Sequence, residues 1–187
     1  MGFPGGTVDV PGAHRPDLAE VVAAATVDPY GHGERLAAVL RDGLSVAPGH
    51  LATNAWVFDP AGRQLLLVRH RTLGWVNPGG HLDDGEAPAA GAARELAEET
   101  GLELVSRHES PVVVRAAVFP ARGDDPAHWH WNLHYLFRGD PAAPLTPEPG
   151  SPAAWFPVDA LPEPRVGDLD DLLALIRKGT VLRQVLE

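Results

Sequence analysis

Two runs of sequence decide the fold of this chain: Gly80-His81-Leu82-Asp83-Asp84-Gly85-Glu86 and Arg94-Glu95-Leu96-Ala97-Glu98-Glu99-Thr100-Gly101-Leu102. The second run belongs to an alanine- and glutamate-rich helix, in which Glu95, Glu98 and Glu99 stand at positions i, i+3 and i+4. Their carboxylates therefore share one helical face. Like charges at this spacing repel one another by roughly 0.2–0.5 kcal/mol per pair, so a chain selected only for stability would not place them together.

The shared carboxylate face indicates a cation site. Carboxylates, backbone carbonyls and water are the ligands that hard divalent cations prefer. Arg94 lies one turn before Glu98 and can hold a carboxylate by a forked hydrogen bond. Gly79 and Gly80 precede the loop and allow close approach of the backbone. We therefore expect the three carboxylates to converge with the Gly80 carbonyl on one oxygen-lined site.

The spacing of these residues resembles the signature of the Nudix hydrolases at every fixed position. The first fixed position is Gly80, and Glu86 follows after five intervening residues. After seven more residues come Arg94-Glu95-Leu96, and then Glu98-Glu99 and Gly101-Leu102, each after one intervening residue. At average amino-acid usage such a match arises by chance in roughly one window in 10⁹, which disfavours the alternative of an accidental, solvated acidic helix. The likeness extends from about Gly49 to about Leu161, and Trp155-Phe156-Pro157-Val158 resembles the closing strand of the family.

The resemblance implies an α/β fold, a Nudix-type α/β/α sandwich with a mixed sheet over residues 46–187. A helical extension over residues 1–45 precedes it and lies outside the likeness. The implied reaction is hydrolysis of a nucleoside diphosphate linked to another group, by attack of water on phosphorus, with Mg²⁺ or Mn²⁺ as cofactor. The implied partner is a small nucleotide-type substrate. Dimers are common in the family, so a homodimer through the N-terminal helices is an expectation by analogy.

The roles of individual residues follow from the same resemblance. The implied metal ligands are Gly80, Glu95, Glu98 and Glu99, and Glu86 and Arg94 form a supporting pair that fixes the loop to the helix. For the group that takes the proton from water, Glu99 and Glu98 are the first candidates, and a residue from another loop is the alternative.

Periodicity along the chain predicts the remaining elements. Residues 1–14 are rich in glycine and proline and are expected to be loose. Helices are predicted over 17–25, 34–44 and 169–177, and strands over 51–58, 64–69, 111–119, 128–137 and 153–158. The turn after residue 58 makes the first two strands a hairpin, and residues 121–127 form a polar loop.

The strand over 128–137 alternates strictly, with His128, His130, Asn132 and His134 on one face and aromatic or apolar residues on the other. Three interpretations of the histidine face stand side by side: a solvated polar surface, the wall of a substrate pocket, and a second metal site completed by His50 or His81. We expect the imidazoles to point to the same side of the sheet as the cation site.

Arg69-His70-Arg71 ends the second predicted strand and is a candidate for contacts with substrate phosphates, with solvated surface residues as the equal alternative. Trp75, shortly before the loop, is either a stacking platform for a base or a core residue.

Composition narrows the classes of function. The 187 residues contain no cysteine and a single lysine, Lys178, which removes thiol chemistry, Cys-ligated zinc and a P-loop ATPase. The net charge of −10 argues against nucleic-acid binding. No apolar stretch approaches the ~20 residues that span a bilayer, and the first residues do not read as a signal peptide, so we expect no membrane partner and a cytoplasmic location.

Two other functions share the fold. A Nudix-type module that binds a nucleotide derivative without turnover has no need of all three glutamates. A diphosphate isomerase of the isoprenoid type typically uses a cysteine, which this chain lacks. The sequence also departs from the patterns of ADP-ribose, dinucleoside-polyphosphate and coenzyme A hydrolases, although such patterns lie in variable loops.

Overall fold

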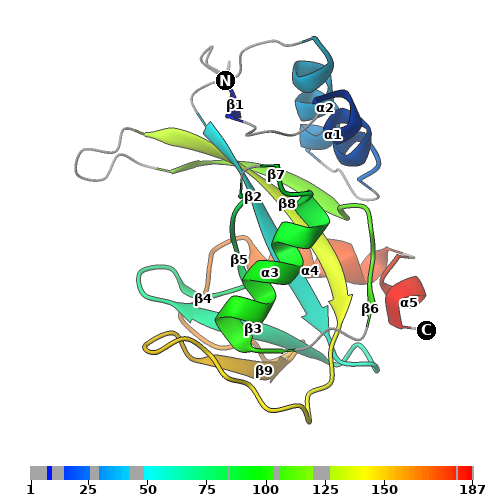
Figure 1. The fold of residues 1–187 in the computed structure, drawn as a ribbon. Helices are drawn as coiled ribbons and strands as arrows, with labels where there is room; N and C mark the ends of the chain where they lie inside the picture. Colours follow the sequence, from blue (N-terminus) through cyan, green and yellow to red (C-terminus); the bar gives the residue numbers. More distant parts are fainter. Residues whose placement is uncertain are drawn as a thin grey trace.

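The computed structural model describes residues 8–9, 15–25, 30–42, 49–83, 85–102, 106–119, 127–179 and 181–186. Nine strands of these residues form one mixed sheet (Figure 1): β1 Val8–Asp9, β2 Gly49–Phe58, β3 Gln64–His70, β4 Gly74–Val76, β5 Gly79–His81, β6 Ser106–Arg107, β7 Val113–Phe119, β8 His128–Arg138 and β9 Ala153–Pro157. The helices are α1 Arg15–Ala23, α2 His32–Asp42, α3 Pro88–Thr100, α4 Leu169–Lys178 and α5 Val181–Leu186. No helix of the described residues is long and apolar enough to cross a membrane.

A parallel pair, β2 and β8, forms the centre of the sheet. The two strands are paired over ten residues, from Gly49 opposite Trp129 to Phe58 opposite Arg138. On one side, β7 runs antiparallel to β8. On the other side, β2 is followed by β5 at one end and by β3 at the other, both antiparallel. This arrangement brings the short strand β5 to the middle of the sheet, beside β2.

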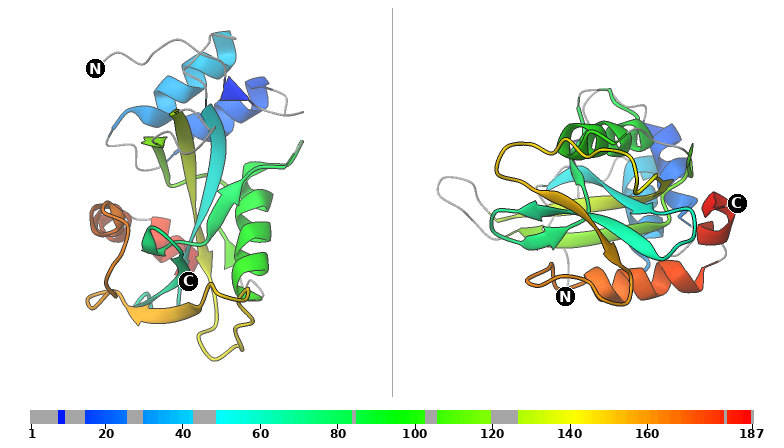
Figure 2. Two further views of the ribbon diagram at one scale, coloured as in Figure 1. Left: turned by 90° about the vertical axis from the view of Figure 1, so that its left-hand side faces the viewer. Right: turned by 90° about the horizontal axis from the view of Figure 1, so that it is seen from below.

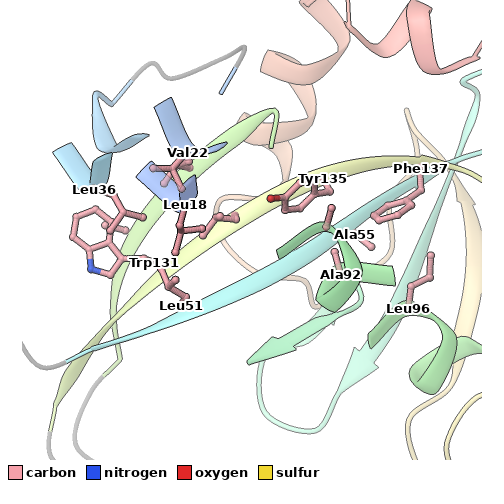
Figure 3. Packing of buried hydrophobic residues seen from close by; sticks show 14 of the residues in the cluster. Leu18, Val22, Leu36, Leu51, Ala55, Ala92, Leu96, Trp131, Tyr135 and Phe137 are labelled. Carbon is pink, nitrogen blue, oxygen red and sulfur yellow. The ribbon is translucent and has the colours of Figure 1, made fainter. Parts of the chain in front are cut away.

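Helices cover both faces of the sheet, as Figure 2 shows from below. On one face, Ala92 and Leu96 of α3 pack in a cluster with Ala55, Tyr135 and Phe137 of the central strands (Figure 3). On the other face, the apolar side of α4, which includes Leu172 and Ile176, packs in a second cluster with Trp56 and Leu136. The predicted α/β/α sandwich with a mixed sheet is confirmed.

The N-terminal helices pack on the end of the same sheet. Leu18 of α1 and Leu36 of α2 are buried in the cluster that also holds Leu51 and Trp131 (Figure 3). At the start of α2, Nδ1 of His32 accepts a hydrogen bond from the backbone N–H of Ala116 in β7 (3.1 Å). Residues 1–45 and residues 46–187 thus share one hydrophobic core. Their division into an extension and a Nudix-type domain stays a prediction that is based on the extent of the sequence resemblance.

Most predicted elements are present with ends shifted by a few residues. The helices predicted over 17–25 and 34–44 are α1 and α2, each starting and ending about two residues earlier. The hairpin is confirmed, with β2 and β3 antiparallel next to the turn. The structure adds β1, β4, β5, β6 and α5, which are too short to show a periodic pattern, and β1 lies within the segment expected to be loose. The loose segment over 1–14 and the polar loop over 121–127 lie largely outside the described residues.

Candidate active site

Helix α3 carries the carboxylates and is placed by the residues at its two ends. Pro88 occupies the first turn, where its missing N–H leaves no hydrogen bond unmade. Gly101 ends the helix in the left-handed conformation, with φ at 67°, and its N–H donates to the carbonyl of Ala97 (2.7 Å). The apolar face of α3 lies on the sheet, so its acidic face is turned toward β5 and the loop before the helix.

Arg94 ties this loop to the helix. Its Nε and Nη2 donate to the two oxygens of Glu86 (2.9 and 3.0 Å), and Nη2 also donates to the carbonyl of His81 (3.0 Å). These charge-assisted bonds lower the pKa of Glu86 and raise that of Arg94. The geometry agrees with the supporting role expected for the Glu86–Arg94 pair.

The same guanidinium gathers two further carboxylates. Its Nη1 donates to Glu95 Oε1 (2.9 Å) and to Glu98 Oε2 (3.1 Å). The Glu95 carboxylate lies directly against Gly80, where a Cβ atom would overlap it. Burial raises the pKa of Glu95, whereas the side chain of Glu98 is 53% exposed and reaches solvent.

Glu99 closes the cluster from the sheet side. Its Oε2 accepts a hydrogen bond from the backbone N–H of Gly79 in β5 (2.9 Å). Burial raises the pKa of Glu99 to about 7, and the neighbouring charge of Glu95 acts in the same direction. Strand β5 therefore lies within contact of two of the three glutamates predicted to bind metal.

This donor set fits a hard divalent cation. The cluster combines the carboxylates of Glu86, Glu95 and Glu98, all bonded to Arg94, with that of Glu99 on the Gly79 N–H, so it carries an excess of negative charge in a partly buried position. A glycine at position 80 leaves its backbone open beside the Glu95 carboxylate. Mg²⁺ and Mn²⁺ bind carboxylate oxygens and backbone carbonyl oxygens, and both kinds of ligand are available at this site.

A pocket of about 380 Å³ opens on the other face of the sheet and extends to Gly79 and Gly80. Its polar lining includes Asn77, His81, Arg115, His130, Asn132, His134 and Asp168. Its apolar lining from α4 and the preceding segment includes Val166, Leu169 and Leu172. A pocket that combines an apolar wall with a few polar groups suits a small organic ligand.

His134 is a buried polar residue of the pocket lining, at 6% exposure. Its Nδ1 accepts a hydrogen bond from Trp56 Nε1–H (3.0 Å), so its proton is on Nε2. Burial lowers the pKa of His134 to about 4, which keeps the ring neutral. Three buried polar atoms of the lining, Thr53 Oγ1, Asn77 Nδ2 and His134 Nε2, have no hydrogen-bond partner within the described part of the chain.

Sequence reasoning missed Arg115 and Asp168. Arg115 Nε pairs with Asp168 Oδ2 (3.3 Å), and the ring of Tyr30 lies against the guanidinium at 4.3 Å. Both residues line the pocket. The available signal was an arginine inside the otherwise apolar strand β7, where a charge requires a partner.

The face predicted for the histidines of β8 is wrong. The aromatic residues Trp131 and Tyr135 pack on the α3 side, so His128, His130 and His134 point to the opposite face. This face is nevertheless not plain surface, because His130 and His134 line the pocket that reaches Gly80. His128 lies beside His130 outside that lining, with 2.9 Å between their Nε2 atoms.

Of Arg69, His70 and Arg71 at the end of β3 and just after it, only His70 belongs to the pocket lining, while Arg69 and Arg71 are exposed outside it. The Nδ1 atom of His70 accepts a hydrogen bond from the N–H of Leu73 (3.1 Å) and so shapes the turn that follows. Trp75 packs edge-on against Phe156, with ring centroids 4.7 Å apart, beside the α4 cluster. Its contacts are those of a core residue.

Comparison with known proteins agrees with this geometry. The model of the NUDIX domain matches residues 48–176. The RNA pyrophosphohydrolase of Brucella anthropi is 32% identical over 124 residues, which cover 55% of this chain and 70% of that protein. The CMP-5'-(N-acetyl-N-hydroxy-3-aminopropyl)phosphonate hydrolase of Streptomyces rubellomurinus is 49% identical over 59 residues, which cover 29% of this chain and 28% of that protein.

Solved structures share the fold at lower identity. A C. elegans Ap4A hydrolase in a binary complex superposes with a TM-score of 0.54 at 20% identity and covers 72% of this chain and 98% of its own. The MutT NUDIX hydrolase from Burkholderia pseudomallei gives a TM-score of 0.53 at 20% identity and covers 68% and 98%. The domain match spans well over half of the chain and includes the whole carboxylate cluster, and the chain therefore belongs to the Nudix hydrolase family.

Proposed function

We propose that this protein is a metal-dependent pyrophosphohydrolase that cleaves a nucleoside diphosphate linked to another group. One observation carries the proposal: Glu95 lies against Gly80 of β5, Glu99 accepts from the Gly79 N–H, and Arg94 holds Glu98 beside Glu95. A module that only binds nucleotides has no use for this surplus of carboxylates beside an open backbone.

The proposed ligands of Mg²⁺ or Mn²⁺ are Glu95, Glu98, Glu99 and the carbonyl of Gly80. When bound, such an ion neutralises phosphate charge and lowers the pKa of water. Arg94 and Glu86 act as positioning residues, because they hold the loop and two glutamates in one arrangement. We assign the uptake of the proton from the attacking water to Glu98, the most solvent-accessible of the three, with Glu99 as the alternative.

The pocket is the proposed site for the group attached to the diphosphate. It begins at Gly79 and Gly80, beside the glutamates, and continues to the buried N–H of His134. A neutral imidazole donor suits a carbonyl or ring-nitrogen acceptor, and Asn132 adds an amide to the same wall. The named activities of the two curated relatives support a nucleotide-derived substrate, and the net charge of −10 favours a small nucleotide over RNA.

A hydrolysis screen with Mg²⁺ and with Mn²⁺ tests the proposal. The substrates are CMP-linked phosphonates, nucleoside triphosphates, nucleotide sugars and dinucleoside polyphosphates, followed by phosphate or nucleotide release. In ¹⁸O-labelled water, the label should appear on a phosphorus of the product, as attack on phosphorus requires. Tight binding of a nucleotide without any product would support the module without turnover instead.

A further inference from the structure

Four imidazoles meet on the pocket face of the sheet, apart from the glutamates of α3. They are His50 of β2, His81 of β5, and His128 and His130 of β8, here called the histidine cluster. Pairing of the strands brings them together, since His50 lies opposite His130, and His81 lies opposite Ala52. All four come from neighbouring positions in the middle strands of one sheet.

The distances within the histidine cluster are short. The ring of His50 has its centroid 5.1 Å from that of His81, 4.9 Å from His128 and 5.7 Å from His130. The rings of His81 and His130 are 5.0 Å apart. One ring nitrogen each of His50, His128 and His130 lies within 4.8 Å of the other two.

We propose that the histidine cluster is a second metal site, distinct from the carboxylate site, for a late first-row divalent ion of the Zn²⁺ type. His50, His128 and His130 are the primary ligands and His81 is the fourth. At metal–nitrogen distances of about 2.0–2.1 Å, tetrahedral ligands lie roughly 3.3–3.4 Å apart, so small rotations of the side chains complete the site.

The ligand type sets the class of ion. Neutral imidazole nitrogens favour Zn²⁺, Ni²⁺ and Cu²⁺, whereas carboxylates and carbonyls favour Mg²⁺ and Mn²⁺. The chain therefore offers two sites of different chemistry on the two faces of the sheet. His50 and His81 are exposed, so an ion can enter without opening the core.

The position of the histidine cluster connects it to the pocket. His81 and His130 belong to the lining of the pocket that reaches Gly79 and Gly80. An ion held by them adds positive charge at the rim of a pocket in an acidic protein, where an anionic ligand benefits from it.

The experiment measures Zn²⁺ binding to the full chain by calorimetry, in excess Mg²⁺ to occupy the carboxylates. We expect one equivalent of Zn²⁺ per chain and, with Co²⁺ as a probe, visible absorption bands typical of nitrogen ligands. The double variant His50→Gln, His130→Gln should bind Zn²⁺ at least ~100-fold more weakly, because even residues that only orient a ligand contribute roughly 10–100-fold.

Two control variants test whether Zn²⁺ binds at the histidine cluster and not at another histidine or at the carboxylates. His108→Gln, a histidine outside the histidine cluster, should retain the affinity, and Glu98→Gln should retain the Co²⁺ spectrum. Zn²⁺ should also raise the melting temperature of the wild type more than that of the single variant His128→Ala, which removes a half-buried ligand. Unchanged Zn²⁺ affinity in the double variant, or no binding by the wild type, overturns the proposal. Hydrolysis with Mg²⁺ alone is measured separately, so neither proposal depends on the result of the other.

Discussion

Arg94 donates hydrogen bonds to three carboxylates and one backbone carbonyl, and through these bonds a single side chain fixes the geometry of the candidate active site. Glu98 differs from its neighbours in one respect: its side chain is largely exposed, while Glu95 is held against Gly80. A change at Glu98 therefore alters the chemistry of the site more than its packing.

We expect Glu98→Gln to lower turnover at least ~100-fold, which corresponds to about 2.7 kcal/mol of transition-state stabilisation. The free energy of unfolding should change by less than about 0.5 kcal/mol, because an exposed ion pair with Arg94 and a like-charge repulsion are lost together. Steady-state kinetics and urea unfolding measure the two effects. Glu109→Gln, the same change at an exposed position outside α3, is the control, and a Glu98→Gln enzyme with wild-type turnover would remove Glu98 from the catalytic assignment.

At His134 we expect a specific pH dependence of stability. In the unfolded chain its pKa is near 6.5, and in the folded protein burial lowers it to about 4. Between these values the unfolded chain binds a proton that the folded protein does not, so this residue makes the free energy of unfolding fall as the pH drops from about 6.5 to about 4.

The size of this effect is on the order of 3 kcal/mol, and His134→Gln should abolish it while keeping an acceptor for Trp56. Denaturant unfolding of both proteins between pH 4 and pH 7 gives the difference curve. His108→Gln, the same substitution outside the pocket lining, is the control for the chemical change itself. A flat difference curve for His134→Gln would show that His134 is charged or solvated in the folded protein.

At the scale of elements, the end of α3 depends on a left-handed residue. Gly101 has φ at 67°, and a Cβ atom there would overlap the hydroxyl of Thr146. The N–H of Thr146 also donates to the carbonyl of Thr100 (2.8 Å), so the segment after β8 is packed on this turn. The end of the carboxylate-bearing helix is thus fixed by a residue distant in sequence.

Gly101→Ala should therefore destabilise the protein by about 2–4 kcal/mol, the sum of a left-handed conformation and a steric overlap. Gly150→Ala is a matched control, because Gly150 also has positive φ, at 89°, but has nothing within 4 Å of the added Cβ. It should cost only about 1–2 kcal/mol. Equal losses of melting temperature in the two variants would contradict the role of the Thr146 contact.

The elements also show why prediction from sequence succeeded where it did. Helix α3 and strand β8 carry long periodic patterns, so their existence and the grouping of their side chains were predictable. Strand β5 has three residues, two of which are glycines, so it has no alternation of polar and apolar residues from which a strand could be predicted. Alternation in β8 shows that His130 and His134 share a face but not which face is covered by α3. Arg115 and Asp168 are 53 residues apart, so their pairing depends on tertiary structure alone.

At the scale of the whole molecule, the N-terminal helices and the sheet form one core. Leu36 is fully buried in the cluster that contains Trp131. We expect Leu36→Ala to lower the free energy of unfolding by about 2–5 kcal/mol and to shift a single cooperative transition. Glu20→Ala, an exposed position of α1, should shift the same transition by less than about 0.5 kcal/mol. Calorimetry would instead show two separate transitions if the helices unfolded independently.

The contact between the ring of Tyr30 and Arg115 links a residue outside the family match to the wall of the pocket. Tyr30 precedes the residues 48–176 that match the family, yet it touches an arginine of the pocket wall that also holds Asp168. We therefore expect that exchange of the segment that carries Tyr30 changes the surroundings of Arg115, while every residue of the hydrolytic signature stays the same. Two homologues with the same signature but different residues at position 30 should prefer different substrates. A chimaera that exchanges only the segment before residue 48 should exchange these substrate preferences.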